Sequence, residues 1–283
     1  MSTRRLRPGG ADIWKAASGC GVLGAPRSTG RRAAAMMFDR VDAFVRDVSQ
    51  VRAEPELVLL LSEICREMGF TYFALTHHVD FRQAPRPTIR LHNYPLEWVD
   101  YFDDQKLGVS DPVHRATNMT SVGFPWSKLP AMIRLTPRDF QVLELAARRG
   151  IGDGFTVPAH VPGESNGSCS FATSAGASLG EEHLALAQLI GAFAFEAARR
   201  VCRLRESPLL PAPQLTDRQR DCVMWAARGK SDWEISRILG VSHETVIQHL
   251  KQARERYGVG KRTLLAVHAL FDGTMSFTDI LKR

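Results

Sequence analysis

Apolar residues recur every three or four positions in four separate stretches of this chain. That spacing places them on one face of a helix. The third stretch opens with Thr136 and Pro137, a capping residue followed by a proline at the first helical position. The fourth has an apolar face wide enough to serve both a core and a partner subunit. The predicted helices are residues 38–48, 57–68, 137–150 and 181–205.

Segments of a different pattern lie between these helices. They are rich in aromatic and β-branched residues, or they alternate apolar with polar residues as half-buried strands do. Two of them flank the turn-rich sequence PGESNG and predict a hairpin. The predicted strands are residues 70–76, 88–92, 154–161 and 168–174. Together with the helices they indicate an α+β domain with one sheet between helical layers.

A third pattern occupies Leu215 to Arg262, where three short helices are each marked by a cap and a glycine. Two begin with a capping box, a pair of side chains that satisfy free backbone N–H groups of the first turn. The link Gly240-Val241-Ser242 is as short as the turn of a helix-turn-helix. The caps are Thr216 with Gln219, Ser231 with Glu234, and Ser242; the helices end at Gly229, Gly240 and Gly258.

The faces of the second and third short helices support this interpretation. Their apolar stripes are Ile235, Ile238 and Leu239, then Val246, Leu250, Ala253 and Tyr257. The polar face of the third helix carries groups that can meet phosphates and base edges in a major groove. A plain solvated surface helix is the alternative, but caps, glycines and a tight turn in register favour DNA binding. The predicted DNA-contacting residues are Ser242, Thr245, Gln248, His249, Lys251 and Arg254.

Positive charge is unevenly distributed along the chain, whose net charge is +7. Residues 1–35 hold seven basic residues and one acidic residue, a net of +6. Residues 208–283 carry +4, whereas residues 36–207 carry −3. The basic character of the C-terminal part therefore lies where nucleic acid would be met.

The first 36 residues are rich in Gly, Ser, Ala and Arg and show no sustained apolar period. They cannot bury enough surface to fold alone, so a disordered basic extension is expected. Such a start resembles a transit peptide in composition, and a DNA-binding tail is another option. We favour an extension from a start codon placed too early, with Met36 or Met37 as the true start.

Aromatic residues concentrate around Asp111, between Tyr94 and Trp126. A pocket with apolar walls and a few fixed polar groups suits a small amphipathic ligand. Asp111 offers an acceptor, whereas the Tyr94 hydroxyl and the Trp98 indole offer donors. Two plainer interpretations stay open at this point: aromatic residues at helical spacing pack in cores, and an aspartate before proline caps a helix.

Residues 215–262 resemble the LuxR-type DNA-binding domain. The matching positions are Leu215, Thr216, Arg218, Gly229, Ser231, Glu234, Ile235, Leu239, Val241, Ser242, Thr245, Val246, His249, Val259 and Arg262. Two positions depart from the family pattern, since Gln219 replaces the usual Glu and Trp233 replaces the usual Lys. Gln219 still caps a helix, and Trp233 is expected to alter contact with the DNA backbone.

The pattern Tyr94-x3-Trp98-x3-Phe102-x8-Asp111-Pro112-x13-Trp126, followed by Gly154, resembles the autoinducer-binding domain of LuxR-type quorum-sensing regulators. Together the two resemblances cover about residues 37–270. They imply a five-stranded antiparallel sheet between helices in the N-terminal domain, an all-α helix-turn-helix domain after it, and a homodimer.

The resemblance implies a ligand, an N-acyl homoserine lactone, and roles for individual residues. Trp98 matches the residue that bonds the lactone carbonyl, Asp111 the acceptor of the amide N–H, and Tyr94 the donor to the acyl carbonyl. Ser170 matches a position that often adds a hydroxyl.

The apolar part of the ligand site is implied in the same way. Phe102, Trp126 and Leu75 are expected to line it. Phe102 stands where the family usually has Tyr, so a polar contact is expected to be absent and the acyl preference altered.

The expected function is a ligand-responsive transcriptional regulator that senses an acyl homoserine lactone and binds an inverted-repeat DNA operator as a homodimer. The alternative is a regulator of the same type that senses a non-lactone small molecule or acts without ligand. The predicted organisation is a disordered basic extension at 1–36, an autoinducer-binding domain at 37–206, a Pro-rich linker at 207–214, and a helix-turn-helix domain at 215–275.

Other classes of protein are disfavoured by what the sequence lacks. The five cysteines are scattered without a CxxC pair, which argues against disulfides or zinc and for a reducing cytoplasm. No run of 18 apolar residues predicts a membrane span. No GxSxG, HExxH, P-loop or GxGxxG motif suggests an enzyme, and the acidic cluster of a response regulator is missing. His77 and His78 are expected to be a loop or surface pair rather than metal ligands, because neighbours on a strand face opposite sides.

Overall fold

The computed structural model describes residues 28–83, 88–204 and 213–281. By their contacts the residues form two units, 1–42 and 43–283. The first 27 residues of the predicted extension and most of the predicted linker lie outside the described residues.

From residue 28 to residue 204 helices and strands follow one another in runs, as in an α+β domain. They are α1 (Ser28–Gln50), α2 (Glu54–Glu67), β1 (Tyr72–His77), β2 (Arg90–His92), α3 (Leu96–Asp104), α4 (Leu107–Ser110), α5 (Pro112–Thr117), β3 (Phe124–Pro125), the 3-10 turn η1 (Trp126–Lys128), α6 (Leu129–Met132), α7 (Pro137–Arg148), β4 (Ile151–Ala159), β5 (Gly167–Ser174), the 3-10 turn η2 (Glu181–His183) and α8 (Leu184–Leu204).

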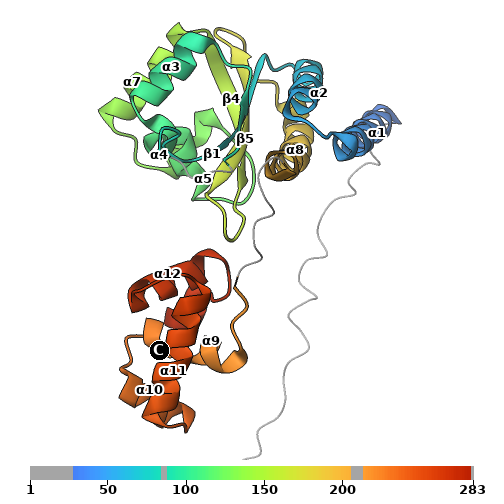
Figure 1. Ribbon diagram of the computed structural model, residues 1–283. Coiled ribbons are helices and arrows are strands. Elements are labelled where there is room, and N and C mark those ends of the chain that lie inside the picture. The colour runs from blue at the N-terminus through green and yellow to red at the C-terminus, as the bar shows by residue number, and fades with distance from the viewer. Residues whose placement is uncertain (1–27, 84–87, 205–212, 282–283) are drawn as a thin grey trace, which may run out of the picture. The chain divides into compact units, whose positions relative to one another are not determined.

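The five strands form one antiparallel sheet in the order β2-β1-β5-β4-β3. This confirms the antiparallel sheet between helices that the resemblance implied. The longest strands, β4 and β5, form the predicted hairpin and lie at the centre of the sheet with β1. In Figure 1, α2 and α8 cover one face of the sheet, and α3, α4, α5 and α7 lie on the other.

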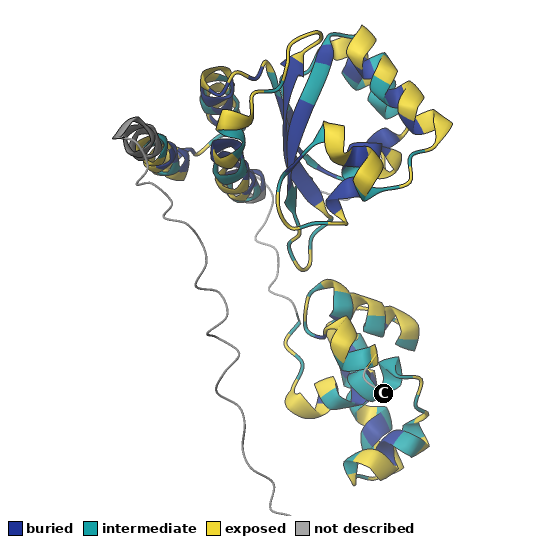
Figure 2. Cartoon of the chain, turned by 180° about the vertical axis from the view of Figure 1, so that it is seen from behind, coloured by how far each residue is buried: buried dark blue, intermediate teal, exposed yellow. Residues whose placement is uncertain are grey.

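The sheet and its α8 side carry the main core of this domain. Six of the eight β5 residues, from Ser168 to Thr173, are at most 6 % exposed, and Figure 2 shows the central strands in the colour of buried residues. Helix α8 buries Leu186, Ile190 and Val201 as its pattern predicted, whereas Phe193 is 41 % exposed. That exposed ring leaves part of the wide apolar face uncovered in the single chain.

The start of α1 differs from the prediction. The helix begins at Ser28, whereas the apolar stripe predicted a start near residue 38 and disorder up to residue 36. The intervening sequence STGRRAAAMM lacks an apolar stripe, but from Arg31 onward it consists of Arg, Ala and Met, which have high helix propensity. Local propensity therefore extends the helix beyond the point where burial begins.

The C-terminal part is all-α. Its helices are α9 (Asp217–Ala227), α10 (Asp232–Leu239), α11 (His243–Arg256), α12 (Arg262–Phe271) and α13 (Phe277–Leu281). Both predicted capping boxes are present with both of their hydrogen bonds, and Ser242 caps α11. Gly229, Gly240 and Gly258 all have positive φ, as the predicted helix ends require.

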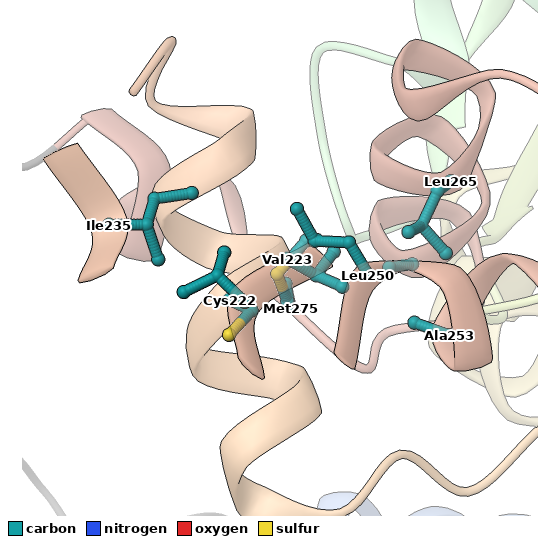
Figure 3. Packing of buried hydrophobic residues seen from close by; sticks show 9 residues of the cluster. Cys222, Val223, Ile235, Leu250, Ala253, Leu265 and Met275 are labelled. Atoms are coloured by element: carbon teal, nitrogen blue, oxygen red, sulfur yellow. The ribbon is translucent and has the colours of Figure 1, made fainter. Parts of the chain in front are cut away.

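One buried cluster holds these helices together. Figure 3 shows its side chains directed at one another from separate helices. Its members are Cys222, Val223, Ile235, Val246, Leu250, Ala253, Leu265, Ala269 and Met275. Ile238, predicted to share the stripe of Ile235, is instead 43 % exposed, because α10 is short and buries only a narrow face. Helix α12, which contributes Leu265 and Ala269, was not assigned from the sequence.

Candidate ligand cavity and nucleic-acid interface

A cavity lies between the sheet and the helices α3, α5 and α7. The space between its walls, open solvent included, is about 710 Å³. Its lining is Ala74, Thr76, Phe81, Arg90, His92, Tyr94, Trp98, Val99, Phe102, Asp111, Val113, His114, Trp126, Val142, Leu143, Ala146, Ile151 and Ser170.

All six residues predicted to bind a ligand line this one cavity: Tyr94, Trp98, Phe102, Asp111, Trp126 and Ser170. Leu75, expected to join them, does not. It lies on β1 between the lining residues Ala74 and Thr76, and neighbours on a strand face opposite sides of the sheet. Leu75 is fully buried on the other side, so it is a core residue.

Tyr94, Trp98 and Phe102 reach the cavity from one continuous segment of the chain. Tyr94 follows β2 directly, and Trp98 and Phe102 lie four residues apart on α3, hence on one helical face. Their rings are 6.0 Å apart at 63°, an edge-to-face arrangement that favours packing. Burial raises the pKa of the Tyr94 hydroxyl, and the nearby Asp111 carboxylate raises it further. Tyr94 is therefore a neutral donor beside an acceptor.

Asp111 caps α5, as the plainer interpretation of the sequence predicted. Its Oδ1 accepts from Val113 N at 2.8 Å and from His114 N at 3.1 Å, with Pro112 at the first helical position. The side chain is only 6 % exposed and lines the cavity. Both cap bonds use Oδ1, so Oδ2 is left to serve another donor. Capping and ligand binding are thus compatible roles for this residue.

A chain of hydrogen bonds crosses the cavity floor from Trp126. Its indole N–H donates to Thr156 Oγ1 at 2.8 Å, and that hydroxyl lies 2.8 Å from Ser170 Oγ. Thr156 has one hydroxyl hydrogen, and donating it to Ser170 frees the Ser170 O–H to point into the cavity. Trp126 presents its ring to the cavity, because its N–H is already used.

Four polar lining residues were missed from the sequence: Thr76, Arg90, His92 and His114. Arg90 and His92 pair with Thr76 and Ala74 of β1 and share the cavity face with them. The alternation within the predicted strand 88–92 was the available signal. His114 contacts Phe102 edge-on, with ring centroids 5.7 Å apart, and its Nδ1 lies 2.9 Å from the carbonyl oxygen of Gly108.

The pair His77 and His78 is not the predicted surface pair. His77 is 6 % exposed, and its Nδ1 accepts from Ile89 N at 3.2 Å. The His78 ring stacks on His114 with centroids 3.9 Å apart, and burial lowers the pKa of His78 well below its usual value, with further lowering by neighbouring histidines. His77 is covered by the segment that leads into β2, and His78 is covered by α5 through its contact with His114. Within the described residues no cluster of His, Cys, Asp and Glu could hold a metal ion.

The predicted DNA-contacting residues all lie on α11 or at its start. Ser242 Oγ accepts from Thr245 N at 3.0 Å and lies 2.7 Å from the Thr245 hydroxyl. Gln248 and Lys251 are exposed, opposite the buried Val246. These side chains are available to a groove of DNA without any rearrangement of the core.

His249 and Arg254 are less available than the other four. His249 is half-buried, and its Nδ1 is buried without a hydrogen-bond partner among the described residues. Arg254 donates to the carbonyl oxygen of Gly260 at 3.3 Å. Trp233, which departs from the family pattern, is 63 % exposed on α10.

None of the described helices combines the length and the apolar character that crossing a membrane requires.

Two family models match the chain. Residues 53–201 match the model described as an autoinducer binding domain, and residues 213–269 match the bacterial regulatory proteins of the luxR family. The first match covers more than half of the chain, and residues 202–212 separate it from the second.

Curated relatives match over most of their length. The transcriptional activator protein AhyR of Aeromonas hydrophila is 30% identical over 229 residues, which cover 79% of this chain and 87% of AhyR. The quorum sensing-dependent regulator RpaR of Rhodopseudomonas palustris is 28% identical over 88% of this chain and 97% of its own length. The transcriptional activator protein LuxR of Aliivibrio fischeri is 25% identical over 82% and 92%.

Solved structures agree on the fold. SdiA of Escherichia coli aligns with a TM-score of 0.61 at 22% identity, over 87% of this chain and 99% of SdiA. A structure of SdiA in complex with octanoyl-rac-glycerol aligns with a TM-score of 0.60 at 23% identity, over 83% of this chain and 95% of that chain.

Proposed function

This chain belongs to the LuxR family of bacterial transcriptional regulators and carries an autoinducer-binding domain, and we propose that its autoinducer is an N-acyl homoserine lactone. The family consists of DNA-binding regulators rather than enzymes. The lactone occupies the cavity between the sheet and α3, α5 and α7. The protein acts in the cytoplasm, where its DNA lies.

The single observation that supports this ligand is the meeting of five polar or aromatic side chains in one cavity. Trp98 donates to the lactone carbonyl, Asp111 accepts the amide N–H through Oδ2, and Tyr94 donates to the acyl carbonyl. Ser170 supplies a further hydroxyl donor, and Trp126 covers the ligand with its ring. A neutral Tyr94 and a carboxylate at Asp111 match one amide, which has one acceptor and one donor.

DNA is bound by α11 in the major groove of each half of an inverted repeat. Ser242, Thr245 and Gln248 contact the DNA together with His249, Lys251 and Arg254. The exposed positions of Gln248 and Lys251 and the net charge of residues 208–283 support this. Arg254 reaches DNA only with its remaining donors, because one of them binds the carbonyl oxygen of Gly260. His249 reaches DNA only with the exposed part of its half-buried ring.

A homodimer follows from the two-fold symmetry of an inverted repeat. Helix α12 offers a contact surface for a second copy, since Leu264, Val267 and Phe271 are 45 %, 53 % and 50 % exposed at helical spacing. The functional parts are an autoinducer-binding domain at 37–206 and a helix-turn-helix domain at 215–275, joined by residues 207–214.

The test is a thermal-shift series on the full chain with acyl homoserine lactones of increasing chain length. A ligand that binds only the folded state adds roughly 2.7 kcal/mol at a hundredfold excess over Kd. A rise in melting temperature with at least one chain length is expected. If no acyl lactone raises it, the ligand assignment is wrong.

A second candidate is a non-lactone acyl compound. The supporting observation is that an SdiA structure of the same fold holds octanoyl-rac-glycerol. Octanoylglycerol belongs in the same series, together with unrelated metabolites. Stabilisation by octanoylglycerol alone would replace the lactone, and stabilisation by none of them would favour a regulator that acts without ligand.

A further inference from the structure

Nδ1 of His92 is a buried nitrogen with no hydrogen-bond partner among the described residues. His92 lines the ligand cavity from β2. Buried polar atoms in folded proteins are nearly always paired, and an unpaired one costs free energy. Because His92 lines the cavity, a ligand in the cavity can supply a partner for this nitrogen.

The imidazole of His92 is neutral near pH 7. Burial lowers its pKa, the charge of Arg90 lowers it further, and Asp103 opposes them. A neutral imidazole has one N–H donor and one acceptor nitrogen. A hydroxyl group can pair with Nδ1 in either tautomer, whereas an oxo oxygen pairs only with the N–H form.

Two neighbouring polar side chains already have partners within the protein. Nη2 of Arg90 donates to both carboxylate oxygens of Asp103 at 2.9 Å, and the Trp126 N–H donates to Thr156. Nδ1 of His92 has no such partner among the described residues and is available to a ligand. Its ring stacks against that of Tyr94, with centroids 6.4 Å apart at 22°.

Strand pairing fixes where His92 lies relative to Ser170. Ala74 of β1 pairs with His92 on one side and with Ser170 on the other, and all three line the cavity. The spacing of strands puts the two polar residues roughly 10 Å apart, with only the Ala74 methyl group between them. The cavity floor therefore has two hydrogen-bonding positions separated by an apolar step.

We infer that the acyl chain of the ligand carries a hydroxyl or oxo oxygen near its amide, and that His92 binds this oxygen. The inference rests on the proposed function, because Tyr94 is the residue assigned to the acyl carbonyl and His92 lies beside it. His92 is then a specificity-determining residue that selects substituted over unsubstituted acyl chains. An unsubstituted chain would leave the buried Nδ1 without a partner from the ligand.

The test compares matched pairs of lactones on the full chain. Each pair has one chain length, with an unsubstituted acyl group in one member and a 3-hydroxy or 3-oxo acyl group in the other. The wild type is expected to bind the substituted member about tenfold more tightly, the effect of one hydrogen bond to a buried group. His92→Phe keeps a ring against Tyr94 but removes both nitrogens, and it should abolish this preference, so that the two members of a pair bind with equal affinity.

His92→Asn is the conservative variant, because its side-chain amide lies close to the position of Nδ1. It should retain most of the preference, and it keeps the test decisive if the Phe variant fails to fold. Equal affinities for both members in the wild type would overturn the inference and leave water as the partner of Nδ1. A preference that persists in His92→Phe would overturn it too. In both cases lactone binding itself would still support the proposed function, whereas no binding of any lactone would remove both.

Discussion

The ligand cavity and the DNA-binding helices are specified over very different distances along the chain. Each cap of α9, α10 and α11 is made by residues three positions apart. The cavity floor joins His92, Ala74, Ser170 and Thr156 across four strands. Residues close in sequence therefore determine where α11 begins, whereas the register of the whole sheet determines which side chains line the ligand cavity.

This difference changes what a substitution does in each region. In the helical domain the capping side chains of Thr216, Ser231 and Ser242 bind backbone N–H groups of their own helices. The exposed side chains of α11 are the ones left for the proposed DNA binding. In the cavity, Nδ1 of His92 has no partner among the described residues, and Asp111 caps α5 through Oδ1 alone, which leaves Oδ2 for the proposed ligand. We expect stability and function to separate in the cavity and to be linked in the helical core.

The largest effect is expected in the helical core. Ile235→Ala removes a fully buried side chain and should destabilise the C-terminal domain by about 2–5 kcal/mol. Segment-resolved hydrogen exchange on the full chain should show lost protection in α9 to α12 and unchanged protection in β5. Ile238→Ala is the matched control, because its side chain on the same helix is 43 % exposed and its loss should have little effect. Loss of protection in β5 as well would show that the two domains do not unfold independently.

Asp111→Asn should separate stability from function. Asparagine caps a helix about as well as aspartate, so the ligand-free melting temperature should stay unchanged. Its neutral amide lacks the charge-assisted bond, so lactone affinity should fall by about 1.5–3 kcal/mol. Lactone titration beside the ligand-free melting curve measures both. Asp111→Ala is the comparison, because it should also lower stability, by about 1 kcal/mol for the lost cap. Unchanged affinity in the Asn variant would remove Asp111 from the ligand site.

Lys251→Ala should alter function in the helical domain without altering its fold, because the side chain is exposed. If Lys251 contacts a guanine edge, its loss should cost about 1–3 kcal/mol at the specific site and relax preference at one base position per half-site. The measurement is binding to an operator and to random DNA of equal length at fixed salt. Equal weakening on both DNAs would mean that Lys251 contacts phosphate only.

The smallest effect is expected from the cap of α10 under acid. A hydrogen bond from the Ser231 backbone, aided by bonds from Lys230 and the Ser231 hydroxyl, lowers the pKa of Glu234 to about 2. Because this pKa is depressed in the folded state, the stabilisation is present above about pH 4.5, the ordinary value, and is lost as pH falls towards 2. Helix content by circular dichroism should therefore decline over that window.

Glu234→Gln supplies the control for this prediction. The amide oxygen still accepts from the Ser231 N–H but does not titrate, so the variant should have a flatter profile between pH 4.5 and pH 2. Identical profiles would assign the acid sensitivity to other carboxylates.

The sequence predicted the helices of the C-terminal domain better than it predicted the lining of the cavity. Thr216, Ser231 and Ser242 identified three helices and their first residues, since a cap and its partner lie within one turn. The cavity residues from Tyr94 to Trp126 came from a spacing pattern, which does not show which side chains face inward. Leu75 was misplaced because strand phase was not set, and His92 was missed because its role depends on pairing with Ala74. The start of α1 was placed late because its first turns follow helix propensity rather than an apolar stripe.

The edges of the sheet have a consequence for how the chain behaves at high concentration. Both edge strands are short, with three residues in β2 and two in β3. Pro125 removes one N–H from the β3 edge, and Arg90 places a charge on the β2 edge. Long, flat and uncharged edges are the surfaces through which sheets of different molecules join into aggregates. This sheet offers few unpaired backbone groups to another copy, so the ligand-free regulator should resist edge-to-edge aggregation.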